Sequence, residues 1–402
     1  MTQNIHLINS DVITGLKSID NNSIDTIITS PPYWGLRNYQ VDGQIGIEPT
    51  LKEFHERLLD VTAQLKRVMK PTGVLFWNMG DSYGGSGGSG GDYNDGGLRE
   101  GQPKVGKSGG MAKCLIMQNE RLIIKMIDDQ GWILRNRIIW NKPNGMPSSA
   151  SDRFTNKYEP VYMLVKNKKY HFDLDAVRVP AKYQEVWSRK GSEKGTPYET
   201  TGNNPRSRWG LTKHEIATQR TSGSYSDPLH TKPIHPSGMK NPGDVWTIPT
   251  QPHKDAHFAI FPDALVEPMI KAGCSLNVCP KCGVVRERVT IRENINPRKI
   301  NGVPNSNEVY SSNNGIPKTG SRCEDTLHHT VGWTTCRCDA GWEPGTVLDP
   351  FAGSGTTMKV AKSLGYNVIG IELNPEYCKI IKKNLLFYQN TLGNIVNEFT
   401  VL

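Results

Sequence analysis

Two short segments of this chain carry residue types that could grip a base and a nucleotide-like cofactor. Near the N-terminus, the apolar run Ile24–Thr29 is followed at once by Ser-Pro-Pro-Tyr. Proline has no N–H, so its stiff backbone leaves carbonyl oxygens free to accept hydrogen bonds. An exocyclic amino group needs such acceptors, and an aromatic ring beside them can stack on a flipped base. The candidate catalytic residues are therefore Ser30, Pro31, Pro32 and Tyr33.

The second segment, Asp349–Thr357, reads Asp-Pro-Phe-Ala-Gly-Ser-Gly-Thr-Thr between an apolar run and a stretch of helical spacing. Glycines let the backbone approach a ligand closely, and a helix N-terminus offers free N–H groups. Glu372 ends the next apolar run, 23 positions after Asp349. An acid at that point accepts hydrogen bonds from ribose hydroxyls in dinucleotide-binding folds. The whole string predicts a site for a nucleotide-like cofactor.

Together the two motifs resemble those of amino-group DNA methyltransferases, which methylate cytosine N4 or adenine N6. The base motif precedes the cofactor motif, an order that resembles the circularly permuted beta group of that family. The resemblance covers about residues 5–180 and 243–390. It implies S-adenosyl-L-methionine as cofactor and double-stranded DNA as substrate. It also implies a restriction-modification system, in which a cognate restriction endonuclease is a possible partner.

The same resemblance assigns roles to individual positions. Phe351 lies against the cofactor, Asp349 and Gly353–Thr357 shape its amino-acid end, and Glu372 holds the ribose. Asp11 is expected to accept a hydrogen bond from the adenine amino group. The full set of expected cofactor contacts is Asp11, Phe261, Pro262, Asp349, Pro350, Phe351, Gly353, Ser354, Gly355, Thr356, Thr357, Glu372 and Asn374.

The choice of base remains open from the residues. Family members with Ser before Pro-Pro-Tyr mostly resemble cytosine-N4 enzymes, and those with Asp mostly resemble adenine-N6 enzymes. Ser30 therefore favours cytosine, with adenine as the alternative. Two other function classes compete: a catalytically silent, zinc-containing DNA-binding protein, and a methyltransferase acting on RNA or protein amines. The intact motifs disfavour the first, and the permuted order with a basic insertion disfavours the second.

Strands alternate with helices along most of the chain, which predicts an α/β fold with a parallel sheet covered by helices. With the resemblance, this indicates a Rossmann-like methyltransferase fold, circularly permuted, that carries two insertions. The expected parts are a catalytic part (1–180), a DNA-recognition insertion (181–244), a cofactor-contacting helix region (245–273), a zinc-binding insertion (274–342) and a cofactor-binding part (343–402). Residues 84–110, rich in Gly, Ser, Asp and Asn, are expected to form a lid or a plain linker.

Positive charge is concentrated in the middle of the chain. The formal net charge is +9, and residues 142–245 hold 17 Lys and Arg against 10 Asp and Glu. Within this stretch Arg206 and Arg208 stand beside Trp209, and further aromatic residues alternate with basic ones. Such interleaving suits phosphate contacts and base stacking. We therefore expect the insertion to contact DNA.

Eight cysteines in a chain without a recognisable signal pattern favour metal binding over disulfides. Four of them form two close pairs that predict a structural zinc site of four thiolates, with Cys274, Cys323 and His328 as alternative ligands. The predicted ligands are Cys279, Cys282, Cys336 and Cys338. No run of about 18 apolar residues is present, so the expectation is a cytoplasmic protein without membrane contact. The sequence leaves the oligomeric state open.

Overall fold

A computed structural model describes residues 3–35, 41–84, 113–148, 150–180, 239–251, 261–295, 325–392 and 397–401. Most of the expected lid and of the DNA-recognition insertion, the segment 252–260 and Cys323 lie outside these residues. The chain divides into two compact units. The larger comprises residues 1–178, 241–288 and 333–402, and it holds both motifs and the four paired cysteines. The smaller comprises residues 179–240 and 289–332.

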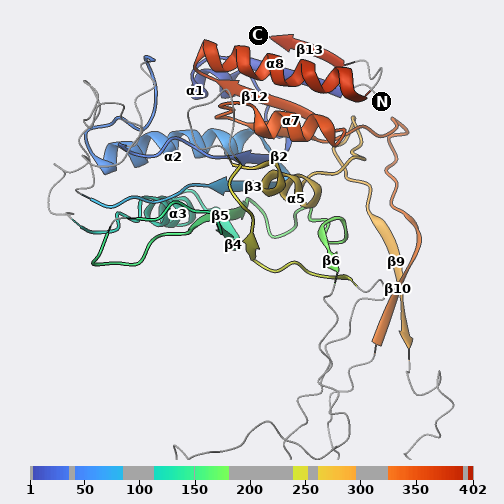
Figure 1. Ribbon diagram of the computed structural model, residues 1–402. Coiled ribbons are helices and arrows are strands. Elements are labelled where there is room, and N and C mark those ends of the chain that lie inside the picture. The colour runs from blue at the N-terminus through green and yellow to red at the C-terminus, as the bar shows by residue number, and fades with distance from the viewer. Residues whose placement is uncertain are drawn as a thin grey trace, which may run out of the picture. The chain divides into compact units, whose positions relative to one another are not determined.

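A nine-stranded sheet in the order β13-β1-β12-β11-β2-β3-β5-β4-β8 forms the centre of the larger unit (Figure 1). The strands are β1 (Gln3–Asn9), β2 (Ile24–Thr29), β3 (Met69–Asn78), β4 (Ile133–Asn141), β5 (Tyr158–Val165), β8 (Val245–Thr247), β11 (Thr346–Asp349), β12 (Asn367–Glu372) and β13 (Asn397–Val401). The N-terminal strand β1 pairs with β12, as expected, but β13 lies beyond it and forms the edge of the sheet.

The sheet departs from the predicted parallel arrangement at one strand. β5 runs antiparallel to both of its neighbours, β3 and β4. The reason is the connection 142–157, which returns the chain directly from β4 to β5 with no crossover helix. A parallel pairing would need such a crossover.

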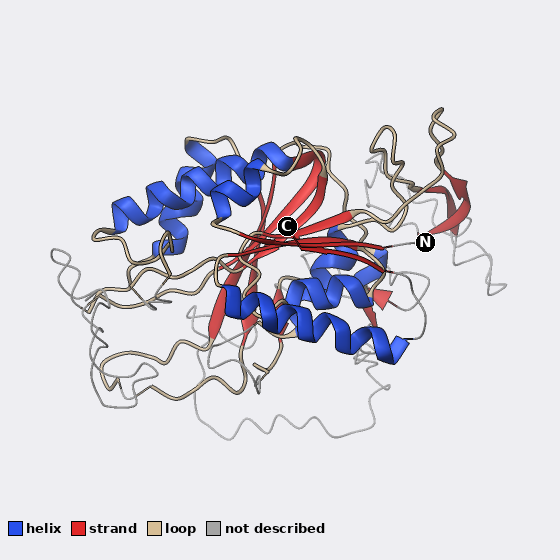
Figure 2. Cartoon of the chain, turned by 90° about the horizontal axis from the view of Figure 1, so that it is seen from above, coloured by secondary structure: helices blue, strands red, loops and turns tan. Residues whose placement is uncertain are grey.

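Helices cover both faces of the sheet (Figure 2). One layer consists of α1 (Val12–Lys17), α2 (Leu51–Val68) and α3 (Gln118–Asp128), and the other of α5 (Asp263–Gly273), α7 (Thr356–Ser363) and α8 (Pro375–Leu392). Side chains alternate along β3: Leu75 and Trp77 join the core on the first face, whereas Val74 and Phe76 join the core on the second. The longest helix of the first layer, α2, begins with a capping box between Thr50 and Glu53, which fixes the residue at which the helix starts.

The remaining described elements are a 3-10 helix and two two-stranded sheets. A 3-10 helix, η2, spans Asp175–Val177, and β6 (Val179–Pro180) pairs with β7 (Met239–Lys240). A second two-stranded sheet joins β9 (Arg288–Ile295) to β10 (Asp325–Trp333). None of the helices in the described part of the chain is long and apolar enough to cross a membrane.

Candidate active site

The two motifs meet at the point where the direction of the sheet's connections reverses. β11 lies between β12 and β2, and it is parallel to both. From β11 the chain leads through α7 to β12 on one side, whereas from β2 it leads through α2 to β3 on the other. The loops after two such strands diverge and leave a crevice at their carboxyl ends, where α/β proteins bind ligands. Segments more than 300 residues apart in sequence thereby share one edge of the sheet.

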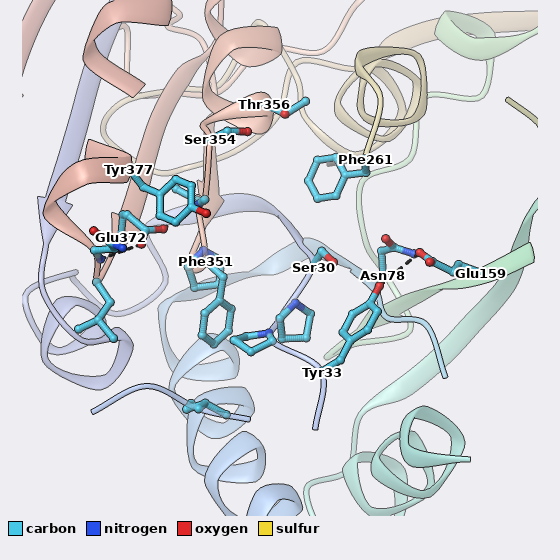
Figure 3. Close-up of a pocket in the computed structure, with 18 of the residues that line it drawn as sticks. Ser30, Tyr33, Asn78, Glu159, Phe261, Phe351, Ser354, Thr356, Glu372 and Tyr377 are labelled. Carbon is cyan, nitrogen blue, oxygen red and sulfur yellow. Dashed lines mark hydrogen bonds between the residues drawn. The ribbon is translucent and has the colours of Figure 1, made fainter. Parts of the chain in front are cut away.

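A cavity of about 1010 Å³ opens at this crevice. Its walls include all four residues of the base motif and much of the glycine loop (Figure 3). The predicted site residues that line it are Ser30, Pro31, Pro32, Tyr33, Phe261, Pro350, Phe351, Gly353, Ser354, Thr356, Glu372 and Asn374. The cavity therefore brings together the two halves of the predicted site.

Glu372 links the end of β12 to the glycine loop. One carboxylate oxygen accepts a hydrogen bond from the Gly353 N–H at 2.8 Å, and the other accepts from the Asn374 N–H at 2.8 Å. Burial raises the pKa of Glu372 to about 7, although these two hydrogen bonds oppose the shift. Since each carboxylate oxygen can accept more than one hydrogen bond, the group can also take two ribose hydroxyls from the cavity side.

Aromatic rings stand beside this carboxylate. Phe351 and Tyr377 both line the cavity next to Glu372, and Figure 3 shows Phe351 between the carboxylate and the base motif. An acid for the ribose, a ring for a flat base and a glycine backbone at close range match the donor and acceptor pattern of a nucleoside. The residues present therefore fit S-adenosylmethionine.

Asp349 is hydrogen-bonded to the glycine loop and does not line the cavity. It is 1 % exposed, and it accepts hydrogen bonds from the Thr357 hydroxyl at 2.7 Å and the Phe351 N–H at 3.1 Å. Burial raises its pKa to about 6. Gly355 is similarly structural: its φ is +84°, and a Cβ there would lie 2.9 Å from Ile381 of α8. These residues shape the loop that lines the cavity.

Two further predicted contacts also stand outside the cavity lining. The carboxylate of Asp11 caps α1 by accepting from the Thr14 N–H at 3.0 Å, while its neighbours Ser10 and Val12 line the cavity. A hydrogen bond with the Thr14 side chain is the main reason that the pKa of Asp11 is lowered, and the Thr14 N–H lowers it further. Pro262 is the N-cap residue of α5. The role of Asp11 at the adenine amino group stays a prediction.

The base motif is tied to residues that sequence reasoning missed. The Tyr33 hydroxyl donates to Glu159 at 3.3 Å, and Lys142 forms an ion pair with the other carboxylate oxygen of Glu159. Burial, together with the negative charge of Glu159, raises the pKa of Tyr33. The amide of Asn78, at the end of β3, donates to the Pro160 carbonyl at 3.1 Å. Asn78, Lys142 and Glu159 all line the cavity.

The direction of β5 explains why these residues reach the site. Glu159 lies near the start of β5, which is antiparallel, so the N-terminal end of this strand meets the carboxyl ends of β3 and β4. Lys142 follows the last residue of β4 directly. The only signal in the sequence was a charged residue at the border of each apolar run, and a single such residue marks no function.

The four predicted metal ligands come together elsewhere in the larger unit. The Sγ atoms of Cys279, Cys282, Cys336 and Cys338 all lie within 4.8 Å of one another. Four thiolates at about 2.3 Å from a tetrahedral zinc ion would stand roughly 3.8 Å apart, so the cluster fits this geometry. Cys274 is buried outside the cluster, and the side chain of His328 lies outside the described part of the structure.

Comparison with known proteins agrees with this geometry. The model of the N6_N4_Mtase family, described as DNA methylase, matches residues 24–277 and 327–383, which is most of the chain. The chain belongs to this family of DNA methylases. As the motifs predict, the methylase is an S-adenosylmethionine-dependent DNA amino-methyltransferase.

Individual relatives are distant but extend over nearly the full length. The methylase is 29% identical to the Type II methyltransferase M.SmaI of Serratia marcescens over 94% of this chain and 90% of that protein. It is 28% identical to the Type II methyltransferase M.Cfr9I of Citrobacter freundii over 94% and 87% of the two chains. The solved structure of the PvuII DNA methyltransferase (cytosine-N4-specific) matches with a TM-score of 0.50 at 16% identity, covering 98% and 89%, and shows that the fold is shared.

Proposed function

We propose that the methylase transfers a methyl group to the N4 amine of a cytosine flipped out of double-stranded DNA. The observation that carries this proposal is the shared cavity, in which the Ser30–Tyr33 loop faces the Phe351–Thr356 loop from the adjacent parallel strand. A flipped base and the cofactor can thus occupy opposite sides of one crevice. S-adenosylmethionine, when bound, supplies an activated methyl group on a sulfonium.

The residues of the chain then orient and polarise the amine. Ser30 and the Pro31 carbonyl accept hydrogen bonds from the amino hydrogens, which directs the nitrogen lone pair away from them and towards the glycine loop. Tyr33 stacks on the base, and its hydrogen bond to Glu159 fixes the ring. No covalent link between enzyme and base is needed, because the amine itself is the nucleophile.

Cofactor contacts are proposed for the residues that line the other half of the cavity. Glu372 is placed to accept from the ribose hydroxyls, Phe351 to pack on the adenine, and Gly353, Ser354 and Thr356 to approach the amino-acid end. Phe261, the residue before the N-cap of α5, also lines the cavity. Asp349, Gly355 and Thr357 act through the shape of the loop.

Cytosine is favoured over adenine by Ser30, because the family resemblance pairs Ser-Pro-Pro-Tyr mostly with cytosine-N4 enzymes. The name of the PvuII enzyme, which shares this fold, also specifies cytosine N4. The test is mass spectrometry of nucleosides from DNA methylated in vitro, with modified-base sequencing to find the recognition site. We expect N4-methylcytosine. N6-methyladenine alone would reject the cytosine assignment, and no methylated nucleoside at all would reject the activity.

The order of elements supports circular permutation of the fold. β2 and its base motif come first in the chain, while the cofactor half β11-α7-β12 comes last, yet β2 and β11 are neighbours in the sheet. We further propose that residues 181–244 form the DNA-recognition insertion, on the basis of their charge and aromatic residues. Since the relatives are named Type II methyltransferases, a cognate restriction endonuclease is the expected partner.

We also propose that the four-cysteine cluster binds one structural zinc ion. Cys279 stands in a tight turn, in which the Gly283 N–H donates to its carbonyl and its own N–H donates to Val284. Cys336 follows β10 closely, and Glu287 and Thr334 exchange two hydrogen bonds of 2.8 Å just before β9 and just after β10. A zinc ion would therefore link the residues that precede the segment 289–332 to the residues that follow it.

A further inference from the structure

The loop that joins β4 to β5, residues 142–157, exposes large apolar side chains beside the cavity. Phe154 is 96% exposed and Met146 is 85% exposed. The next most exposed large apolar side chain among the described residues is Val245, at 61%. A single exposed apolar residue needs no explanation. Two such residues on one loop, one of which lines the cavity, call for an explanation.

This loop forms part of the cavity rim. Asn144, Gly145, Met146 and Asn156 belong to the cavity lining, whereas Phe154 stands outside it. Met146 therefore marks the boundary between the cavity and the outside. Phe154 lies two residues before Asn156 in the same loop, so its backbone stands near the rim of the cavity, and its ring is exposed.

Several contacts hold the loop in place. Asn144 and Thr250 exchange two hydrogen bonds of 2.9 and 3.1 Å between side chain and backbone. The Tyr83 hydroxyl and Asn156 are 3.3 Å apart, and the guanidinium of Arg153 lies 3.8 Å from the centre of the Tyr83 ring. The exposed side chains are thus presented by an anchored loop.

The charge around the loop indicates what meets it. Arg153 and Lys157 flank Phe154, and Lys113 forms an ion pair of 2.9 Å with Asp152, the single acid of the loop. A cationic loop with an exposed ring suits the phosphates and the base stack of a duplex.

We propose that Phe154 enters the DNA stack and fills the space that the flipped base leaves, with Met146 bordering the path of that base into the cavity. The proposal rests on base flipping as proposed above. Inserted apolar side chains partly unstack base steps at a cost of a few kcal/mol, and flipping is cheapest when the target base is already unpaired. The contribution of Phe154 should therefore depend on whether the target base is paired.

The test compares Phe154→Ala with wild type on two duplexes that carry the recognition site, one with a paired target base and one with a mismatched target. Leu386→Ala is the matched control, since Leu386 is an exposed apolar residue on α8 that does not line the cavity. We expect Phe154→Ala to lose roughly tenfold to a hundredfold in kcat/KM on the paired duplex and less than about threefold on the mismatch. Phe154→Leu should restore most of the loss, and Leu386→Ala should match wild type on both duplexes.

Equal losses of Phe154→Ala on the two duplexes would overturn the proposal, as would unchanged kcat/KM on the paired one. Because Phe154 is almost fully exposed, its replacement leaves the packed core intact, and unchanged cofactor affinity confirms this in the same preparation. Failure of the proposed function is distinct, since wild type would then form N4-methylcytosine on neither duplex.

Discussion

The hydroxyl of Tyr33 is 3.3 Å from a carboxylate oxygen of Glu159, although Tyr33 follows β2 and Glu159 lies on β5, on the other side of β3. Glu159 is in turn held by Lys142, so the ring of Tyr33 is fixed by a partner that is itself fixed. An aromatic ring held in this way can stack on a base at little cost in conformational freedom. This relationship separates two contributions of Tyr33, the ring and the hydroxyl.

Removal of the ring should be more damaging than removal of the hydroxyl. Base stacking on an aromatic ring is worth about 1–3 kcal/mol, so Tyr33→Ala should lower kcat/KM by roughly tenfold to a hundredfold. Tyr33→Phe keeps the ring and loses one hydrogen bond, so we expect a loss below about tenfold. Single-turnover kinetics and cofactor titration measure both effects. Equal activity of Tyr33→Ala and wild type would remove Tyr33 from the site.

Cofactor affinity should depend on pH through Glu372. Its pKa is raised from 4.5 to about 7 in the folded protein, so the carboxylate takes up a proton as the pH falls below about 7. The ionised form is the better acceptor for ribose hydroxyls, and binding should therefore weaken by roughly tenfold between pH 8 and pH 6. In the protein without cofactor, the free energy of unfolding should fall as the pH rises from 4.5 to 7, because the buried Glu372 resists ionisation in the folded state. Asp349 adds to the raised pKa by its negative charge.

Isothermal titration with S-adenosylmethionine at several pH values measures this dependence. Glu372→Gln should bind weakly and lose most of the pH dependence. The control is Glu376→Gln, because Glu376 is exposed on the first turn of α8 and pairs with Lys379. A Glu372→Gln variant with the pH profile of wild type would show that another group titrates.

The glycines of the cofactor loop should separate stability from binding. A Cβ at Gly355 would lie 2.9 Å from Ile381 at a φ of +84°, whereas a Cβ at Gly353, φ +55°, would have only the Phe351 carbonyl within 4 Å. Gly355→Ala should therefore lower the free energy of unfolding by roughly 2–4 kcal/mol, through strain and overpacking. Gly353→Ala should cost about 1–2 kcal/mol and mainly weaken cofactor binding. Urea unfolding of both variants without cofactor, followed by cofactor titration, tests the difference; equal losses of stability would contradict it.

Much of the fold could be predicted because turn residues border the apolar runs. β2 begins and ends where the sequence predicts, between Asn-Ser and Pro-Pro. β11 and β12 end where the sequence predicts, at Asp349 before a proline and at Glu372 before Leu-Asn-Pro. The two motifs sit at the ends of these strands, so half of the site follows from local patterns. The meeting of β2 and β11 does not follow from local patterns, and it came from the family resemblance.

The rest depends on long-range geometry. Glu159 and Lys142 reach the cavity because β5 reverses direction, and no pattern within β5 encodes that reversal. The buried position of the Asp349 carboxylate also depends on this geometry: strand alternation alone does not say that it turns inward to Thr357. The grouping of the four cysteines could be predicted because two close cysteine pairs are typical of a metal site. The metal itself stays a prediction.

Purified methylase should contain about one zinc per chain. Cys279→Ser should lower the zinc content and speed hydrogen exchange around Glu287 and Thr334, because metal binding energy contributes to folding at such sites. Cys114→Ser is the control, since Cys114 is an exposed thiol outside the cluster. Metal analysis of protein prepared without chelators measures the content. A zinc-free protein with normal exchange in this region would refute the assignment.

Charge removal in the basic insertion should weaken DNA binding through phosphate contacts. Arg206 and Arg208 stand in the most basic part of the chain, so we expect the double change Arg206→Gln with Arg208→Gln to raise Kd for duplex DNA. Each lost phosphate contact lowers the slope of log Kd against log salt by about 0.9, so the slope should fall by roughly 1.8. The same number of charges is removed in Lys52→Gln with Lys379→Gln, two exposed lysines on α2 and α8. Fluorescence anisotropy at several salt concentrations distinguishes the pairs: equal slopes for both double variants would mean that net charge alone acts, and an unchanged slope for the arginine pair would place the DNA-contacting surface elsewhere.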